Sequence, residues 1–241
     1  MKLIIDTLQH YISDLLWSAR GFGRGDMHIH TSDQEKLNMG FNDYTCNWGL
    51  HICGLYENEQ ERDQIILNFL AEGSRAGDLQ LYCPVERSKE DFEEKISGMC
   101  PECASKLHDP DVFQVRSARE IYYPNGTFSP REMDKNLGAL FEESQLKGPR
   151  NVRATAEMAW ALDAVPGREF LFVYESRLNY FIPGKPWISI CMYNLKRFDG
   201  ATIMDVLRTH PFTIGKGVIT ENPFFVHPDK WLAENAPEYL Y

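Results

Sequence analysis

The sequence predicts an α/β fold in which helices cover both faces of a largely parallel central sheet. From residue 48 to residue 209, strand-like and helix-like stretches alternate along the chain. This alternation is typical of parallel strands joined by crossover helices. With 241 residues, of which 43% are hydrophobic, the chain fits one large domain or one domain with an extension.

The first 46 residues differ from the alternating part. Apolar residues recur at helical spacing from Leu3 to Leu16, and the glycine-rich run at 21–25 ends the predicted helix. Residues 26–46 show no clear period and are expected to form a loop or linker. The expected parts are an N-terminal helix and linker over 1–45, a main domain over 46–230, and a C-terminal tail over 231–241. The apolar stripe of the first helix either packs on its own domain or forms a homodimer contact.

The alternating part has recognisable helix starts. Asn58 fits an N-cap position with Glu61 three residues on, and Ser129 precedes Pro130 as an N-cap precedes a first-turn proline. Strands are expected at 50–56, 79–83, 112–115, 152–158, 187–193, 212–214 and 218–219. Helices are expected after Asn58, after Ser88, after Ser129, over 169–181 and over 201–209.

The charge of the chain argues against contact with nucleic acid. Lys and Arg number 25 against 35 Asp and Glu, which gives a net charge of −10 with neutral histidines. A nucleic-acid-binding face needs clustered basic side chains that replace phosphate counterions. We therefore expect no direct nucleic-acid partner.

No segment has the composition of a membrane span or a secretion signal. No apolar run reaches the ~18–20 residues that cross a bilayer. Asp6, Gln9, His10 and Asp14 interrupt the apolar residues of the N-terminus. We expect a cytoplasmic chain with no membrane partner, whose six cysteines are reduced thiols, metal ligands or redox groups instead of structural disulfides.

The sequence lacks the common motifs of phosphate binding and hydrolysis. There is no GxxxxGK loop followed by Ser or Thr, no GxSxG and no HExxH. The first strand of the alternating part runs into the acidic turn at 56–59, which would repel a polyphosphate. A ligand cleft without chemistry of its own is therefore the favoured expectation.

Candidate ligand contacts follow from the rule that open parallel sheets bind ligands beyond the carboxyl ends of their strands. Aromatic, thiol and carboxylate side chains at these ends predict a mixed pocket for a small molecule. Trp160 is either a ligand contact or part of the core. The expected ligand-binding residues are His51, Cys53, Tyr56, Cys83, Glu157, Trp160, Tyr193 and His210.

Two histidines among these residues leave alternatives open. His51 and Cys53 point to one face of a strand, either as soft metal ligands or as a core thiol beside a hydrogen-bonded histidine. His210 is a structural hydrogen-bonding group or a switchable ligand contact. A transferase or hydrolase that uses Glu157 with His210 is a further alternative, and it requires the two side chains to lie together.

Cys100 and Cys103 form a single CxxC motif. This spacing suits zinc or another metal, a redox pair, or two free thiols. No second CxxC completes a four-ligand zinc site. His28 and His30 form an HxH that is either a metal site or two solvated side chains.

An ordered set of motifs resembles the MEDS domain, the methanogen/methylotroph sensory domain named after a dichloromethane-responsive repressor. The motifs are GLHICGLYENEQE at 49–61, YYPNGTFSPREM at 122–133, VRATAEMAWAL at 152–162, YESRLNYF at 174–181, ISICMYNLKRFD at 188–199, DVLRTHPFTI at 205–214 and ENPFFVHP at 221–228. They cover about three quarters of the chain in the family's order. The residues that match family motifs are His51, Tyr56, Glu157, Trp160, Tyr174, Glu175, Asn179, Tyr193, Asp205, Arg208, His210 and Asn222.

The resemblance implies a RecA/KaiC-like fold without the phosphate loop, and a non-catalytic role in sensing small hydrocarbon-derived ligands. It also implies output through a DNA-binding domain or a histidine kinase. The sequence shows no helix-turn-helix or kinase segment, so we expect a regulatory protein partner, a kinase or a transcription factor. Residues 1–45 and the Cys100/Cys103 loop depart from the family pattern and suggest a version that binds a metal or a metal-containing cofactor.

Overall fold

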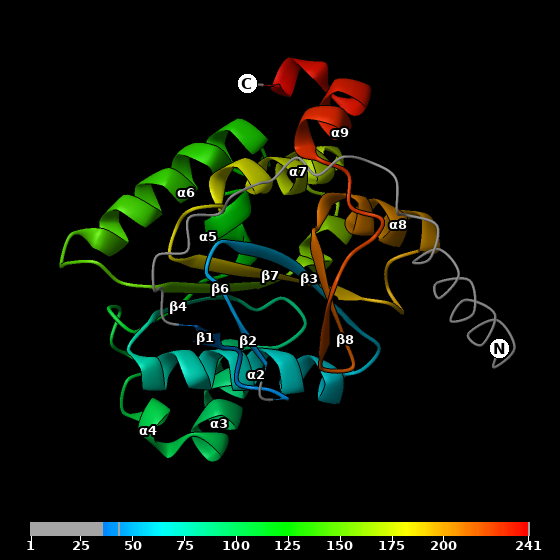
Figure 1. Cartoon of the computed structure of the whole chain (residues 1–241). Helices are drawn as coiled ribbons and strands as arrows, with labels where there is room; N and C mark the ends of the chain where they lie inside the picture. Colours follow the sequence, from blue (N-terminus) through cyan, green and yellow to red (C-terminus); the bar gives the residue numbers. More distant parts are fainter. Residues whose placement is uncertain (1–35, 43, 241) are drawn as a thin grey trace, which may run out of the picture. The chain divides into compact units, whose positions relative to one another are not determined.

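A seven-stranded sheet lies at the centre of the molecule (Figure 1). The structure, a computed structural model, describes residues 36–42 and 44–240. The strand order is β5-β4-β6-β7-β3-β8-β9, in which β8 and β9 pair antiparallel and every other pair is parallel. The strands are β3 (Leu50–Tyr56), β4 (Leu79–Cys83), β5 (Phe113–Val115), β6 (Val152–Glu157), β7 (Trp187–Asn194), β8 (Phe212–Gly215) and β9 (Val218–Glu221).

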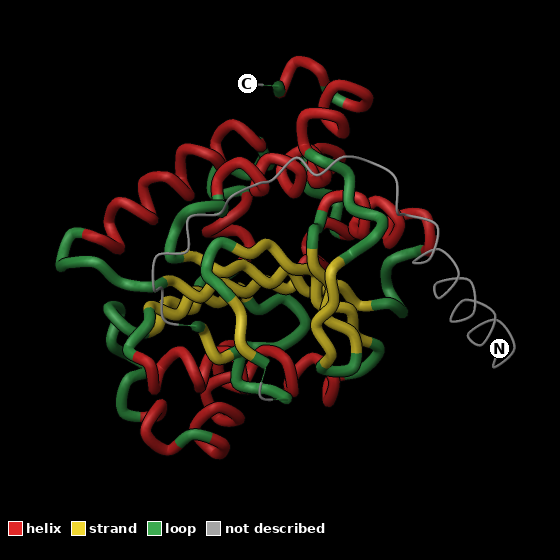
Figure 2. Tube along the Cα trace, viewed as in Figure 1, coloured by secondary structure: helices red, strands yellow, loops and turns green. Residues whose placement is uncertain are grey.

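Helices cover both faces of this sheet, as the tube in Figure 2 shows. One layer holds α2 (Glu59–Ala76), α3 (Lys89–Met99) and α4 (Pro101–Ala104), below the sheet in Figure 1. The opposite layer holds α5 (Ala118–Tyr122), α6 (Pro130–Gln145), α7 (Leu171–Phe181) and α8 (Gly200–Thr209), with α9 (Pro228–Asn235) against α7. Three short 3-10 helices are η1 (Met158–Leu162), η2 (Arg168–Phe170) and η3 (Pro237–Tyr239). The predicted α/β class with a largely parallel, twice-covered sheet is confirmed.

Side-chain alternation divides the core into two layers. On β3, Ile52 and Tyr56 belong to the apolar cluster between the sheet and helices α2 and α3. Cys53 belongs to the cluster on the side of α5, α6 and α7. Since successive side chains of a strand point to opposite faces, His51 and Cys53 share a face, as predicted. The functional geometry described below follows from this division.

Two short strands lie at 37–38 and 45–46, within the stretch that was expected to be a loop or linker. β1 (Leu37–Asn38) and β2 (Thr45–Cys46) form a small antiparallel sheet. Leu37, Met39 and Phe41 are buried in the cluster beneath the main sheet. The backbone carbonyl of Asn38 accepts a hydrogen bond from the Arg153 guanidinium at 2.8 Å. The expected boundary between residues 45 and 46 therefore falls within β2, which pairs with β1.

Other differences concern short or terminal elements. The sequence pattern missed α5, whose capping box is formed by Ser117 and Glu120. The expected tail from residue 231 instead continues α9, and Trp231 and Leu232 are buried against α7. The predicted N-terminal helix and the His28/His30 pair lie outside the described residues. In the described part of the chain, no helix is both long and apolar enough to cross a membrane.

Candidate functional site

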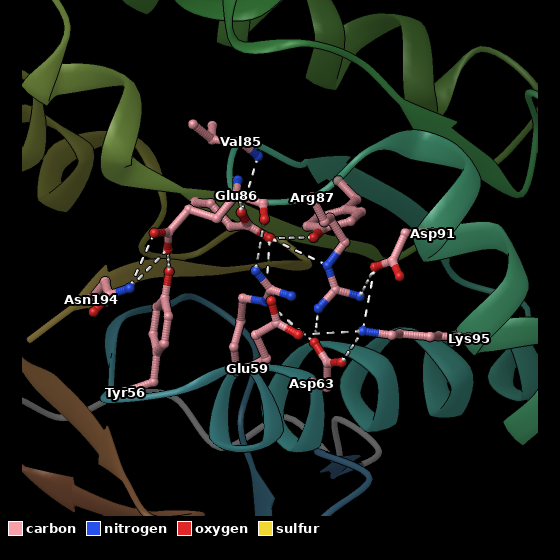
Figure 3. Close-up of polar contacts among 12 residues, drawn as sticks. Tyr56, Glu59, Asp63, Val85, Glu86, Arg87, Asp91, Lys95 and Asn194 are labelled. Carbon is pink, nitrogen blue, oxygen red and sulfur yellow. Dashed lines mark hydrogen bonds and ion pairs between the residues drawn. The ribbon is translucent and has the colours of Figure 1, made fainter. Parts of the chain in front are cut away.

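A network of polar side chains lies at the carboxyl edge of the sheet (Figure 3), with a buried carboxylate at its centre. Glu157 ends β6 and is fully buried. Its Oε1 accepts a hydrogen bond from the Tyr82 hydroxyl at 2.5 Å. Its Oε2 accepts from the backbone N–H groups of Val85 at 3.0 Å and Glu86 at 2.5 Å. Glu157 therefore fixes the segment that follows β4.

Two buried arginines neutralise this carboxylate. Arg62 Nε and Arg87 Nε lie 3.8 Å and 3.7 Å from Glu157 Oε1. Arg87 also pairs with Asp63 on α2 (Figure 3). Burial and the neighbouring Arg62 lower the pKa of Arg87. A buried charge requires partners of this kind, so this group of side chains has the character of a structural ion network.

A second carboxylate, Glu86, connects the carboxyl ends of β3 and β7. The Tyr56 hydroxyl donates a hydrogen bond to Glu86, and Asn194 Nδ2 lies 3.1 Å and 3.3 Å from its two oxygens. Burial and the hydrogen bond to Glu86 raise the pKa of Tyr56, so its hydroxyl stays protonated and donates. Phosphate sites of parallel sheets use the backbone N–H groups at the turn from a strand to the next helix. Here carboxylates face that position, which disfavours a polyphosphate.

On the face toward α5, α6 and α7, the sheet carries mostly small side chains. Strand register aligns Leu81, Ala154, Ser189 and His51 in one row across β4, β6, β7 and β3. The next row consists of Cys83, Ala156, Cys191 and Cys53. Small side chains on neighbouring strands leave space between the sheet and the helices above it.

A pocket of about 370 Å³ occupies this space between the sheet and helices α5, α6 and α7. Its floor includes Cys83, Ala154 and Ser189. Apolar side chains from the helices form the walls: Ile121, Tyr122, Met133, Leu137, Leu140, Tyr174 and Leu178. Exposed polar side chains form the rim: Arg116, Glu120, Asn136 and Glu143. An apolar interior with a few polar groups at the entrance is typical of small-molecule sites.

Trp160 does not line this pocket but belongs to the aromatic core beside it. Its ring stacks on Tyr122 with a centroid separation of 4.6 Å and contacts Phe128 at 5.0 Å. Tyr122 and Tyr174 in turn meet edge to face. Of the two roles that the sequence left open for Trp160, the structure places it in the core.

A fully buried cluster of four metal-capable side chains lies next to the pocket. It consists of His51 on β3, Glu175 on α7, Cys191 on β7 and His210 at the end of α8. Glu175 Oε2 is 3.2 Å from His51 Nε2 and 3.4 Å from His210 Nε2. Cys191 Sγ is 3.5 Å from both His51 Nε2 and Glu175 Oε2. The Tyr193 hydroxyl donates to the other oxygen of Glu175 at 2.6 Å.

Burial and the histidines set the charges in this cluster. Burial, followed by the neighbouring His210, lowers the pKa of His51 to about 4, so this ring is neutral at pH 7. Burial alone would raise the pKa of Glu175, but the two histidines outweigh it and hold that pKa well below its usual range. Burial raises the pKa of the Cys191 thiol, with Glu175 as the next cause.

The neighbouring amide gives this cluster a superficial likeness to a nucleophile–base–orienter triad. His51 Nδ1 lies 3.2 Å from Asn179 Oδ1, while its Nε2 faces Cys191. Reactive cysteines have lowered pKa values and partial exposure. Cys191 is 2% exposed, and its pKa is raised. The arrangement therefore has the chemistry of a ligand set and not of a nucleophile.

The structure distributes the predicted ligand contacts over several places. His51, Tyr193 and His210 meet in the buried cluster, whereas Tyr56 and Glu157 belong to the polar network at the carboxyl edge. Cys83 lines the pocket, and Cys53 lies in the register row beside it, where its thiol points to the Phe212 carbonyl. Glu157 and His210 contact separate sets of side chains, so no described contact supports the pairing required by the enzyme alternative.

Cys191 was missed as a site residue, and Glu175 and Asn179 were identified only through the family motifs. Cys191 shares a register row with Cys53. A single sequence does not reveal that β3 and β7 are neighbours. The thiol could have been found only from the strand order.

Cys100 and Cys103 are joined in a disulfide, which corrects the expectation of reduced cysteines at this motif. Both are buried in the apolar cluster that contains residues of α2 and α3. As a disulfide the two sulfurs do not serve as thiolate ligands. Among the described residues, the histidine, cysteine and carboxylate groups that converge lie elsewhere. Metal binding by the reduced pair and a redox role stay predictions.

Comparison with known proteins places this architecture in a family. The model of the family described as MEDS, "MEthanogen/methylotroph, DcmR Sensory domain", matches residues 50–211. The chain belongs to the MEDS family. This match confirms the resemblance carried by the sequence motifs, and the matched range contains the four residues of the buried cluster.

This MEDS chain is similar in sequence to one curated protein and similar in fold to one solved structure, as follows. The transcriptional repressor DcmR of Methylorubrum extorquens (strain DSM 6343 / CIP 106787 / DM4) is 24% identical over 164 residues, 68% of this chain and 58% of the repressor. The chain thus matches less than two thirds of that relative's length. A KaiC-like protein from Pyrococcus horikoshii OT3 superposes with a TM-score of 0.53 at 9% identity, covering 74% of this chain and 79% of that one. This second likeness confirms the KaiC-like fold and concerns the fold alone.

Proposed function

We propose that this MEDS domain senses a small, largely apolar organic molecule bound in the pocket between the sheet and helices α5, α6 and α7. The family and the repressor relative support a sensory and regulatory role. The pocket above the floor of small side chains is the observation that supports this ligand class. The response passes to a regulatory protein partner. The cytoplasmic location and the possible homodimer stay predictions.

The size of the pocket limits the ligand. A protein cavity of about 150 Å³ binds benzene, so a pocket of about 370 Å³ suits a compound of roughly 10–20 non-hydrogen atoms. A corrinoid or a nucleoside triphosphate is larger. This comparison supports a small hydrocarbon-derived ligand over a large metal-containing cofactor at this position.

Thermal and urea denaturation in the presence of defined probes test this proposal. Naphthalene and biphenyl, with 10 and 12 carbon atoms, represent the proposed class, and cyanocobalamin and ATP represent larger ligands. A probe at a hundredfold excess over its Kd is expected to stabilise the folded state by about 2.7 kcal/mol. Ala154→Leu extends a larger side chain from the pocket floor and is expected to abolish this stabilisation. Ala201→Leu makes the same change at an exposed position of α8 and keeps it.

Two results would contradict this function. One is the absence of stabilisation by both small probes at concentrations that do not denature the protein. The other is equal stabilisation of the wild type and of Ala154→Leu by the same probe, which would place binding outside the pocket. Stabilisation by cyanocobalamin or ATP alone would move the protein to another ligand class.

A further inference from the structure

We propose that the buried cluster is a zinc site, with His51 Nε2, Glu175 Oε2, Cys191 Sγ and His210 Nε2 as its four ligands. The inference stands apart from the proposed organic ligand, because it depends on a different set of atoms. Three observations support it: the spacing of the donor atoms, the orientation of the two histidine rings, and the hydrogen bonds that hold the side chains in place.

The donor atoms have the spacing of a tetrahedral site. Zinc binds nitrogen and carboxylate oxygen at about 2.0–2.2 Å and thiolate sulfur at about 2.3 Å. A tetrahedron with these bond lengths has edges of about 3.3–3.7 Å. Four of the six separations between the donor atoms are 3.2 Å, 3.4 Å, 3.5 Å and 3.5 Å. All four donor atoms lie within 4.8 Å of one another.

The lone pairs of both histidines point into the cluster. Asn179 Nδ2 donates to the Glu175, Ser176 and Thr209 carbonyls at 3.1 Å, 3.2 Å and 2.8 Å, which turns its Oδ1 toward His51 Nδ1. His210 Nδ1 lies 2.7 Å from the Val206 carbonyl, an acceptor. In each ring Nδ1 faces an acceptor and carries the proton of the neutral form, so Nε2 is the atom directed at Glu175 that can bind a metal.

Both Nε2 atoms face Oε2 of Glu175, which is itself a hydrogen-bond acceptor. His210 Nε2 is fully buried without a hydrogen-bond partner. The Cys191 thiol lies 3.5 Å from both Glu175 Oε2 and His51 Nε2 and can donate its proton to either, but no described donor reaches the buried His210 Nε2. A divalent cation satisfies all of them at once. The thiol proton of Cys191 is released to solvent when the thiolate binds.

The surrounding contacts are those of a structural metal site. Histidine ligands usually donate their second N–H to a carbonyl or amide oxygen, which fixes ring orientation and tautomer. Asn179 and Val206 fill this role here, and the Tyr193 hydroxyl holds Oε1 of Glu175. Four protein ligands without an exposed position make a closed site. Such an ion would join β3, β7, α7 and the end of α8 beside the pocket.

Metal analysis of the whole chain tests the site. Protein purified without chelator, then supplied with one equivalent of zinc and desalted, is expected to hold about one zinc per chain by mass spectrometry. Cys191→Ala and His210→Ala remove single ligands and are expected to lower zinc affinity at least about 100-fold, since loss of an outer contact alone costs 10–100-fold. Asn179→Ala, which removes a positioning residue, is expected to fall within that 10–100-fold range.

Matched controls separate this site from the other cysteines. Cys53→Ala removes a buried thiol of the same face outside the ligand set and is expected to keep full zinc content. Cys100→Ser with Cys103→Ser is also expected to keep it. Zinc lost only in this double variant would assign the metal to the CxxC motif and overturn the proposal. A folded wild-type chain that binds no zinc would overturn it as well.

Cobalt substitution covers the case in which a ligand variant does not fold. The wild-type chain loaded with Co²⁺ is expected to show an intense visible band of a tetrahedral ion and a near-ultraviolet thiolate-to-metal band. A weak octahedral spectrum without the thiolate band would contradict coordination by Cys191.

Discussion

Glu157 shows how one buried carboxylate can hold an edge of the sheet. It accepts hydrogen bonds from Tyr82 and from two backbone N–H groups, and it lies between two buried arginines. We expect Glu157→Gln to lower the free energy of unfolding by about 3 kcal/mol, because the arginines lose their shared anion and the new amide faces N–H donors. Urea denaturation followed by circular dichroism measures this change.

An exposed carboxylate provides the comparison for Glu157. Glu132 is 62% exposed and pairs with Lys135 one turn away. Glu132→Gln makes the same chemical change and is expected to alter stability by no more than about 0.5 kcal/mol. A loss under about 1 kcal/mol for Glu157→Gln would show that the network tolerates a neutral centre.

The sequence predicted where several site residues lie on their strands, but it did not predict which residues they contact. Tyr56, Cys83 and Glu157 lie near the carboxyl ends of their strands, as expected from the segment pattern. Their partners depend on which strands are neighbours. Cys191 meets His51 because β7 pairs with β3, although 140 residues separate them along the chain. No local pattern encodes that pairing.

At the scale of elements, the acidic turn before α2 contains the residue that caps this helix. Asn58 Oδ1 accepts from the Glu61 N–H at 3.0 Å, which confirms the predicted N-cap. The Glu61 carboxylate accepts from the Glu57 N–H instead of the N-cap N–H, so the capping box is shifted by one residue. We expect Asn58→Ala to cost about 1 kcal/mol of unfolding free energy and Asn58→Gly only a few tenths, by urea denaturation. Equal losses would contradict the capping role.

Several elements that the sequence missed are too short to show a helical or strand period. Helices such as α2 and α6 show apolar residues at helical spacing over several turns, and both were predicted. β1 and β2 contain two residues each, and α5 contains five. Their stability comes from tertiary contacts: Met39 and Phe41 are buried beneath the main sheet, and Tyr122 packs on Trp160. Such contacts follow from the fold and are not readable from a short segment.

At the scale of the whole molecule, the two faces of one sheet serve different purposes. Large apolar residues fill the layer between the sheet and helices α2 and α3. The opposite face carries small and polar side chains in register, next to the pocket and the buried cluster of His51, Glu175, Cys191 and His210. The alternation of segments and the family motifs predicted the fold class. The strand order and register, which create this asymmetry, required the structure.

The balance of charge over the molecule leads to a prediction about nucleic acid. The net charge is −10, and Arg62, Arg153 and Arg177 are buried in ion pairs with carboxylates, which leaves them unable to reach phosphates. We expect no saturable binding of this chain to a 20-bp duplex below about 100 µM at low salt, since even non-specific binding requires basic contacts. Fluorescence anisotropy measures it, with a lysine homopolymer as the positive control. Saturable binding that weakens as salt increases would show that this acidic chain presents a basic face, and would make direct DNA contact part of its regulatory role.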